Sequence, residues 1–182
     1  VKATRSRLHQ VGGAYQEKPI DYGAYAQMLE GLPDDLADPT VRAFCTRLLA
    51  EHTSTRERLS IMESFYETLL KPLQPITSIA DLACGLNPLA LPWMPVSPET
   101  RYYACDIYSD MLSFIRLFFD HFSQPIQVDL CDLTDFILPE PVQVALLLKT
   151  IPCLEHLDRD IGRKLITSLP AEHIIVSFPA HS

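Results

Sequence analysis

Residues 78–88 of the chain read SIADLACGLNP, in which a short apolar run at 78–83 (SIADLA) is followed by a glycine and a proline. Four further apolar runs follow, at residues 101–106 (RYYACD), 126–130 (IQVDL), 142–149 (VQVALLLK) and 173–178 (HIIVSF). Short runs of this kind, bounded by turn residues, are typical of buried β-strands. The run at 142–149 is apolar along almost its whole length, which predicts a central parallel strand covered on both faces.

Helical patterns lie between these runs. Residues 108–122 carry one apolar stripe made by Met111, Ile115, Phe118 and Phe119, and residues 153–169 form a second candidate helix. A strand, helix, strand order predicts parallel pairing through right-handed crossovers. The sequence therefore predicts an α/β fold with a Rossmann-like sheet.

The first 70 residues read as helices instead. Three helices are predicted here, each with a signal at its start: Asp21 as an N-cap, Pro39 in a first turn, and the S-x-x-E capping box at residues 54–57. Pro72 ends the third helix. We expect an N-terminal helical subdomain over residues 1–57 and a Rossmann-like domain over residues 58–182.

Composition and charge narrow the class of protein. Of the 182 residues, 47% are hydrophobic and 21% charged, which excludes a disordered tail. No membrane span is predicted, because the sequence has no uninterrupted apolar stretch of about 18 residues. The net charge of −8 argues against a nucleic-acid partner when taken as a whole. The excess lies entirely in residues 59–182, with 7 basic and 15 acidic side chains, whereas residues 1–58 hold 8 of each.

The chain also begins with a short basic arm. The first 18 residues hold four basic side chains, Lys2, Arg5, Arg7 and Lys18, and one acidic side chain, Glu17. Two interpretations stay open on charge alone, a contact with a polyanion and an ordinary solvated helix face.

Cysteine and histidine usage favours a reducing compartment without a metal site. The five cysteines are odd in number, widely spaced and form no C-x-x-C pair, so we expect buried thiols rather than a disulfide framework or a zinc site. The six histidines show no metal-ligand spacing.

Polar residues at successive strand ends point to a ligand. The loop at 81–88 holds one glycine, Gly85, and no lysine follows it, so it is neither a G-x-G-x-x-G turn nor a P-loop. Asp106 lies 21 residues after Gly85, where a carboxylate accepts ribose hydroxyls. Asp132 follows the third strand, placed for an exocyclic amine. These features predict an adenosine-type cofactor without phosphates, and S-adenosylmethionine fits best.

Several longer segments carry a family resemblance. HTSTRERL (52–59), DLACGLNPLALPWMP (81–95), LKTIPCLE (148–155) and VSFP (176–179) resemble the aminoglycoside-resistance 16S rRNA methyltransferases, as does TRSRLHQVGGAY (4–15). Members of that family methylate N7 of a guanine in the decoding site. The resemblance implies a class I S-adenosylmethionine-dependent methyltransferase fold whose C-terminal strands are missing from this chain.

The resemblance also implies a role for each matched position. Arg58 would pair with the methionine carboxylate, Ala83 and Gly85 would line the methionine and ribose, and Asp106 would hold the ribose hydroxyls. Further cofactor contacts would come from five residues: Ile107 and Leu133 on the adenine faces, Asp132 on its amine, and Leu148 and Lys149 near the sulfonium. No residue is assigned as catalytic; Lys149 is the nearest candidate.

The implied reaction needs no general base, because guanine N7 carries a free lone pair at neutral pH. The resemblance implies a cytoplasmic monomer whose partner is the 30S ribosomal subunit, held by Lys2, Arg5, Arg7 and His9. Two alternatives stay open: a methyltransferase with another substrate, and a non-catalytic domain that binds the cofactor or RNA.

Overall fold

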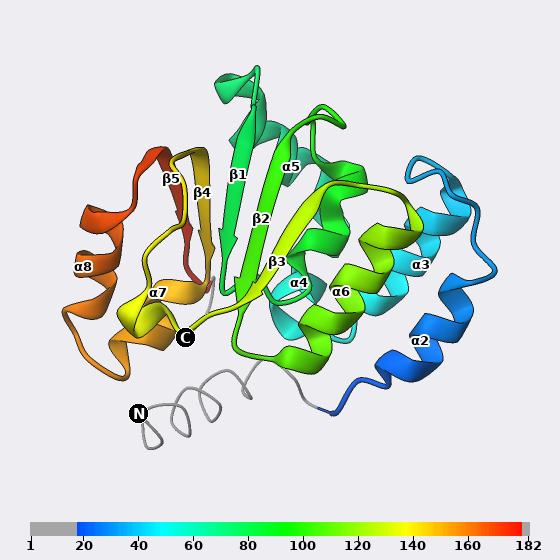
Figure 1. Cartoon of the computed structure of the whole chain (residues 1–182), viewed down its shortest axis with the longest axis horizontal. Coiled ribbons are helices and arrows are strands. Elements are labelled where there is room, and N and C mark those ends of the chain that lie inside the picture. Colours follow the sequence, from blue (N-terminus) through cyan, green and yellow to red (C-terminus); the bar gives the residue numbers. More distant parts are fainter. Residues whose placement is uncertain (1–17, 180–182) are drawn as a thin grey trace.

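The structure is a computed structural model that describes residues 18–179 and is built on one five-stranded sheet (Figure 1). All the strands are parallel, in the order β3-β2-β1-β4-β5. Their bounds are β1 Ser78–Leu82, β2 Arg101–Asp106, β3 Ile126–Leu130, β4 Val142–Leu148 and β5 Ala171–Ser177. The predicted α/β sheet is confirmed, because each of the five apolar runs forms a strand at or within two residues of its expected place.

The sheet is buried on both faces. Alternate residues of β4 belong to different clusters: Val144 and Leu146 pack on one side, and Ala145 and Leu147 on the other. Successive side chains of a strand point to opposite faces, so an unbroken apolar run is what two covered faces require. The expectation for residues 142–149 is therefore confirmed.

Two unequal helical layers cover these faces (Figure 1). The larger layer holds α2 Tyr22–Leu29, α3 Pro39–Leu49, α4 Thr53–Arg56, α5 Met62–Leu70 and α6 Ser109–His121. The smaller layer holds α7 Thr150–Glu155 and α8 Ile161–Ser168. Residues 18–179 also hold short 3-10 turns: η2 Leu59–Ile61, η3 Lys71–Leu73, η4 Asn87–Trp93 and η5 Leu133–Asp135. The N-terminal helices α2, α3 and α5 share one apolar core with the sheet and α6.

Two expected helix starts are confirmed and a third is wrong. The Asp21 side chain accepts from the Ala24 amide at 3.0 Å, and Pro39 occupies the first turn of α3. The capping box at 54–57 does not form, because α4 begins one residue earlier, at Thr53, with His52 as its N-cap, and ends at Arg56. The chain then turns through η2 before α5, and this break carries the buried side chain of Arg58.

The helix expected over residues 153–169 is also divided. It forms α7 and α8, separated by a turn in which the Asp158 carboxylate accepts from the amide of Asp160 at 2.9 Å. An aspartate that bonds to nearby backbone offers the chain an alternative to the helical ladder, which explains the break.

The cysteines depart from expectation at one pair. Cys105 and Cys131 form a disulfide, with their Cα atoms 5.7 Å apart, whereas Cys45, Cys84 and Cys153 are not disulfide-bonded. The two residues are distant in sequence but close in space, because β2 and β3 are neighbouring parallel strands that end at the same edge. Sequence spacing alone hides this proximity.

Candidate functional site

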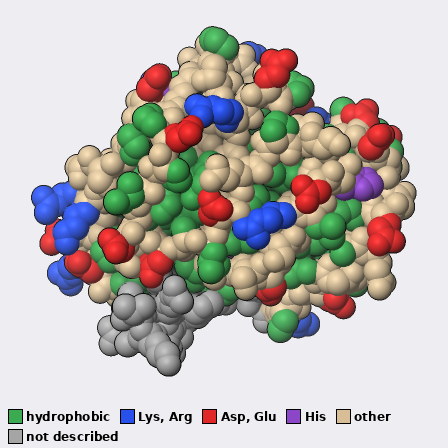
Figure 2. Space-filling model, in the orientation of Figure 1, with side chains coloured by type: hydrophobic (Ala, Val, Ile, Leu, Met, Phe, Trp, Pro, Cys, Tyr) green, Lys and Arg blue, Asp and Glu red, His purple; other side chains and the backbone are tan. Residues whose placement is uncertain are grey.

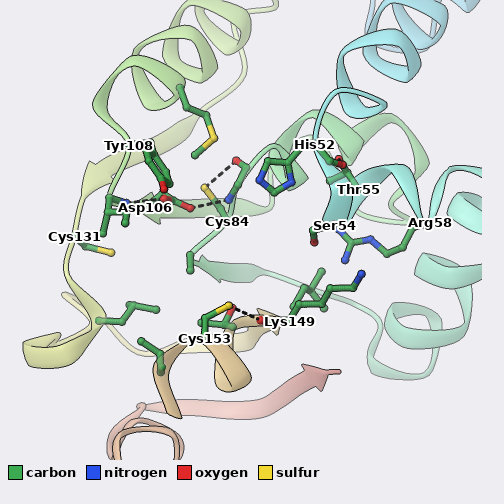
Figure 3. A pocket seen from close by; sticks show the side chains of 18 residues that line it. His52, Ser54, Thr55, Arg58, Cys84, Asp106, Tyr108, Cys131, Lys149 and Cys153 are labelled. Atoms are coloured by element: carbon green, nitrogen blue, oxygen red, sulfur yellow. Dashed lines mark hydrogen bonds between the residues drawn. The ribbon is translucent and has the colours of Figure 1, made fainter. Parts of the chain in front are cut away.

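A pocket opens at the carboxyl ends of the central strands (Figure 3). Parallel α/β sheets bind ligands in this position, where the order of connections reverses. Eight of the nine cofactor positions expected from sequence line it: Arg58, Ala83, Gly85, Asp106, Ile107, Leu133, Leu148 and Lys149. The fold therefore brings together residues that are spread over 92 positions of the chain.

Left-handed backbone is concentrated at this pocket. Ala83, Gly85 and Lys149 have φ values of 52°, 52° and 62°. Such values are uncommon outside glycine, and at Ala83 and Lys149 they store strain of the kind that recurs at ligand sites. The loop after β1 and the end of β4 are therefore shaped for the pocket rather than for the most relaxed local backbone.

Asp106 is fixed by the loop it faces. Its Oδ2 accepts from the Gly85 amide at 2.8 Å, and its Oδ1 accepts from the Ile107 amide at 2.6 Å. The side chain is 7% exposed and lies at the end of β2. A carboxylate can accept several hydrogen bonds through its two oxygens, which is the chemistry that binding of ribose hydroxyls requires.

Arg58 lies across the pocket from Asp106 (Figure 3). Its Nη2 donates to Asn87 Oδ1 at 3.0 Å, and the guanidinium lies 5.4 Å from the ring centroid of Phe65. Its Nε and Nη1 are buried and find no hydrogen-bond partner among residues 18–179. Buried donors are nearly always satisfied, so this arrangement suits an incoming anion such as a carboxylate.

His52 stands between these two groups and was given no role by the sequence (Figure 3). Burial, followed by the positive charges of Arg58 and Lys149, lowers its pKa to about 4. The imidazole is therefore neutral at pH 7. The only sequence signal was its position inside HTSTRERL, since its proximity to Gly85 arises from the fold.

Lys149 extends its ammonium to Glu57, with which it forms an ion pair. Its side chain is 8% exposed, whereas that of Glu57 is 50% exposed. The ion pair ties the end of β4 to the segment after α4. The Lys149 ammonium is thus engaged in holding two elements together beside the pocket.

Asp132 is the expected cofactor residue that does not line the pocket. Its Oδ1 accepts from the Thr134 amide at 3.0 Å and from the Thr134 hydroxyl at 2.7 Å, so it caps η5. Ile107 and Leu133, the residues expected on the adenine faces, both line the pocket. The expected contact of Asp132 with an exocyclic amine stays a prediction.

The residues expected to bind RNA, Lys2, Arg5, Arg7 and His9, lie outside the described part of the chain. On the face seen in Figure 2, acidic side chains are scattered, and the basic side chains that gather at its left edge lie beside acidic ones. Several basic side chains are paired: Arg163 with Asp160 at 3.2 Å, and Arg101 with Glu140 at 2.6 Å. Within residues 18–179, no cluster of three or more histidine, cysteine or acidic side chains is arranged for a metal ion. No helix in that range is long and apolar enough to cross a membrane.

Comparison with known proteins decides the family. A model described as "Ribosomal RNA methyltransferase (FmrO)" matches residues 1–182. The chain belongs to this family. The resemblance noted in the sequence, and the methyltransferase fold it implied, are thereby confirmed.

Several bacterial methyltransferases are similar along the whole chain. A 16S rRNA (guanine(1405)-N(7))-methyltransferase of Micromonospora echinospora is 38% identical, covering 100% of this chain and 67% of the relative. One of Micromonospora rosea is 36% identical with the same coverage. The crystal structure of 16S rRNA methyltransferase RmtF in complex with S-adenosyl-L-homocysteine matches with a TM-score of 0.80 and 29% identity, covering 100% of this chain and 66% of RmtF. The chain therefore spans about two thirds of these relatives.

Proposed function

We propose that this chain binds S-adenosylmethionine and methylates N7 of guanine 1405 of 16S rRNA in the small ribosomal subunit, conferring aminoglycoside resistance. One observation carries the proposal: a single pocket holds a buried arginine with unpartnered donors on one side and an anchored carboxylate on the other. These two groups match the two polar ends of the cofactor, the methionine carboxylate and the ribose. Relatives that are 36 to 38% identical carry that activity in their names.

The residues of the pocket would hold the cofactor end to end. Arg58 would bind the methionine carboxylate through Nε and Nη1, and Asp106 would accept the ribose hydroxyls. Ile107 and Leu133 would contact the adenine, with Asp132 beside its amine, while Ala83, Gly85, Leu148 and Lys149 would line the remainder. S-adenosylmethionine, when bound, supplies an activated methyl group.

The chain's own contribution to the reaction would be alignment and electrostatics. Guanine N7 has a lone pair at neutral pH, so no residue has to remove a proton from it. Lys149, the nearest candidate for a direct role, is ion-paired with Glu57. The pocket would orient the two reactants and exclude water, which is a large part of the barrier reduction in group transfers.

Access to the base sets a second requirement. N7 lies in the major groove, which is deep and narrow in A-form RNA. The guanine would therefore have to leave its stack and enter the pocket. We assign the holding of the 30S subunit to the N-terminal helical subdomain, residues 1–57, with Lys2, Arg5, Arg7 and His9 on phosphates, and the chemistry to residues 58–182. The protein would act as a cytoplasmic monomer.

The test is methylation of purified small subunits by this chain with labelled S-adenosylmethionine, followed by mapping of the modified base by cleavage at 7-methylguanine. We expect label at guanine 1405 alone, and loss of label with Asp106→Ala. Label at another base would favour the alternative of a different substrate. Cofactor binding by calorimetry without any label on the subunit would favour a non-catalytic binding domain.

The basic arm has its own test. Replacing Arg5 and Arg7 by glutamate should weaken subunit binding and reduce its dependence on salt, because fewer counterions are released. Cofactor affinity, measured in parallel, should stay unchanged. Unchanged subunit affinity in the double variant would show that the arm does not contact the ribosome.

A further inference from the structure

The guanidinium of Arg58 is held on one edge by a chain of buried polar groups behind the pocket wall. Asn87 accepts from Arg58 Nη2 through Oδ1, and it donates through Nδ2 to Asp81 Oδ2 at 2.8 Å. All three side chains are nearly inaccessible, at 6%, 2% and 1% exposure. A cationic group, Arg58, and an acidic group, Asp81, are thus joined by one amide.

Asn87 can make this link because an amide carries an acceptor and a donor at once. Its Oδ1 also accepts from the hydroxyl of Tyr66 on α5. The oxygen is therefore turned to the arginine and the nitrogen to the carboxylate, with no freedom to exchange them. A carboxylate at this position would satisfy the arginine but not the aspartate, and an apolar side chain would satisfy neither.

Asp81 is anchored from the opposite side. Its Oδ2 also accepts from the hydroxyl of Tyr102 on β2, at 2.8 Å. Burial raises its pKa to about 7, while the bonds from Asn87 and Tyr102 and the charge of Arg58 act in the opposite direction. Because Asp81 lies on β1, the middle strand of the sheet, whose residues are all buried, the chain of groups begins inside the sheet.

A buried arginine needs this support. A charged side chain removed from water is costly unless it is hydrogen-bonded and neutralised. The Asn87 amide occupies one nitrogen and the ring of Phe65 covers one face of the guanidinium, which leaves Nε and Nη1 as the donors without partners among residues 18–179.

We propose that Asp81 and Asn87 are positioning residues that orient Arg58 toward the carboxylate of the cofactor. They do not touch the cofactor; they act by fixing the direction in which the two unpartnered donors point. This inference rests on the proposed cofactor site, and it adds two residues that the sequence placed only within the loop after the first strand.

The test compares two ligands that differ in the group Arg58 would bind. S-adenosylhomocysteine has the amino acid carboxylate, whereas 5′-methylthioadenosine keeps the adenosine and the sulfur and lacks the amino acid end. For Asn87→Ala we expect the calorimetric Kd of S-adenosylhomocysteine to rise about 10-fold or more, the value of a charge-assisted hydrogen bond. The Kd of 5′-methylthioadenosine should stay within about twofold of the wild type, because the charge-assisted bond is absent from that complex.

A double-mutant cycle shows whether Asn87 acts through Arg58. Arg58→Lys keeps the charge but lacks the planar donors, so it should lower S-adenosylhomocysteine affinity by itself. Adding Asn87→Ala to Arg58→Lys should then cause no further loss. Fully additive losses would overturn the positioning role.

If a thermal melt shows that Asn87→Ala is not folded, two more conservative variants replace it in the test. Asp81→Asn keeps the shape and removes the charge, and Tyr66→Phe removes only the hydroxyl on Asn87. Each should raise the Kd of S-adenosylhomocysteine several-fold and leave the Kd of 5′-methylthioadenosine unchanged. Tyr25→Phe is the control, because Tyr25 is also a buried tyrosine, 8% exposed against 1% for Tyr66, and its hydroxyl donates to Glu51 rather than to Asn87.

The outcomes separate the two proposals. If the wild-type protein binds neither ligand, the cofactor site itself is wrong. If it binds both and the folded variants lose both equally, or lose neither, the cofactor site stands and the positioning role fails.

Discussion

The imidazole of His52 lies against the backbone of Gly85: a Cβ placed on Gly85 would come 3.2 Å from Cε1 of His52. Gly85 also has a φ of +52°, in the left-handed region. The position therefore requires glycine for two separate reasons, the backbone angle and the lack of space.

Gly85→Ala should accordingly impair both stability and binding. The left-handed backbone costs an L-residue about 1–2 kcal/mol, and the added methyl must push the His52 ring aside. We expect a loss of that size in urea unfolding, together with weaker S-adenosylhomocysteine binding by calorimetry. Adding His52→Ala removes the contact but not the backbone strain, so it should restore part of the affinity and little of the stability. A Gly85→Ala protein with wild-type stability would contradict this account.

His52 should make stability depend on pH. Its pKa falls from 6.5 to about 4 on folding, so between these values the unfolded chain binds a proton that the folded protein does not. Stability is therefore fully present above pH 6.5 and is lost as the pH falls toward 4, by about 3 kcal/mol.

The check is urea unfolding at several pH values from 7.5 to 4.5. The difference in stability between the wild type and His52→Gln should shrink as the pH falls. The exposed His156, replaced in the same way, is the control. A difference that stays constant across this range would show that His52 is not held neutral by its surroundings.

Asp106→Asn should weaken cofactor binding in spite of its identical shape. Both carboxylate oxygens accept from backbone amides, of Gly85 and of Ile107, so the new amide nitrogen would face a donor. We expect the Kd for S-adenosylhomocysteine to rise about 10-fold or more, since hydrogen bonds to charged groups contribute about 1.5–3 kcal/mol. Asp110→Asn, an exposed change at the start of α6, should leave the Kd unaltered.

Replacing Gly162 by alanine should destabilise the protein, although this change usually stabilises a helix. Alanine is about 1 kcal/mol better than glycine inside a helix, but here its Cβ would come 2.9 Å from Cγ2 of Ile151, a stiff β-branched side chain. We expect Gly162→Ala to lose about 1–3 kcal/mol in urea unfolding through overpacking between α7 and α8. For Gly31→Ala the nearest atom is 3.7 Å away, so this control should show no such loss.

The disulfide predicts how many cysteines react with an alkylating reagent before and after reduction. Alkylation of the denatured protein should modify three cysteines without reductant and all five after reduction, because Cys45, Cys84 and Cys153 are not disulfide-bonded. Mass spectrometry of the digest should then place the bridge between Cys105 and Cys131. Five modified cysteines before reduction would refute the pairing.

The parts of the fold that depend on local pattern could be predicted from the sequence. Strand ends are set by the apolar runs, and the rule that ligands bind beyond the carboxyl ends of parallel strands was enough to bring Gly85 and Asp106 to one pocket. Asp132 shows where that rule stops, because its carboxylate also caps a turn with Thr134, and a strand-end position does not reveal such a bond.

The remaining parts depend on contacts distant in sequence. The break before Arg58 places that side chain against Asn87, 29 residues later, and helix propensity does not reveal such a bond. The partners of Asp81 come from β2 and from η4, so its role could be recognised only once the sheet was assembled. His52 likewise belongs to the site only because the fold lays it on Gly85.

The two sides of the pocket belong to different layers of the molecule. Arg58 stands on the helical segment, Asp106 on the sheet, and the apolar core between these layers sets their separation. A ligand that contacts both residues must match the distance between them. Substitutions deep in that core, remote from the ligand, would therefore change affinity by altering this distance. An inhibitor that occupies only the adenosine part of the site would keep its affinity after such substitutions. An inhibitor that mimics the whole cofactor would bind more weakly after each of them.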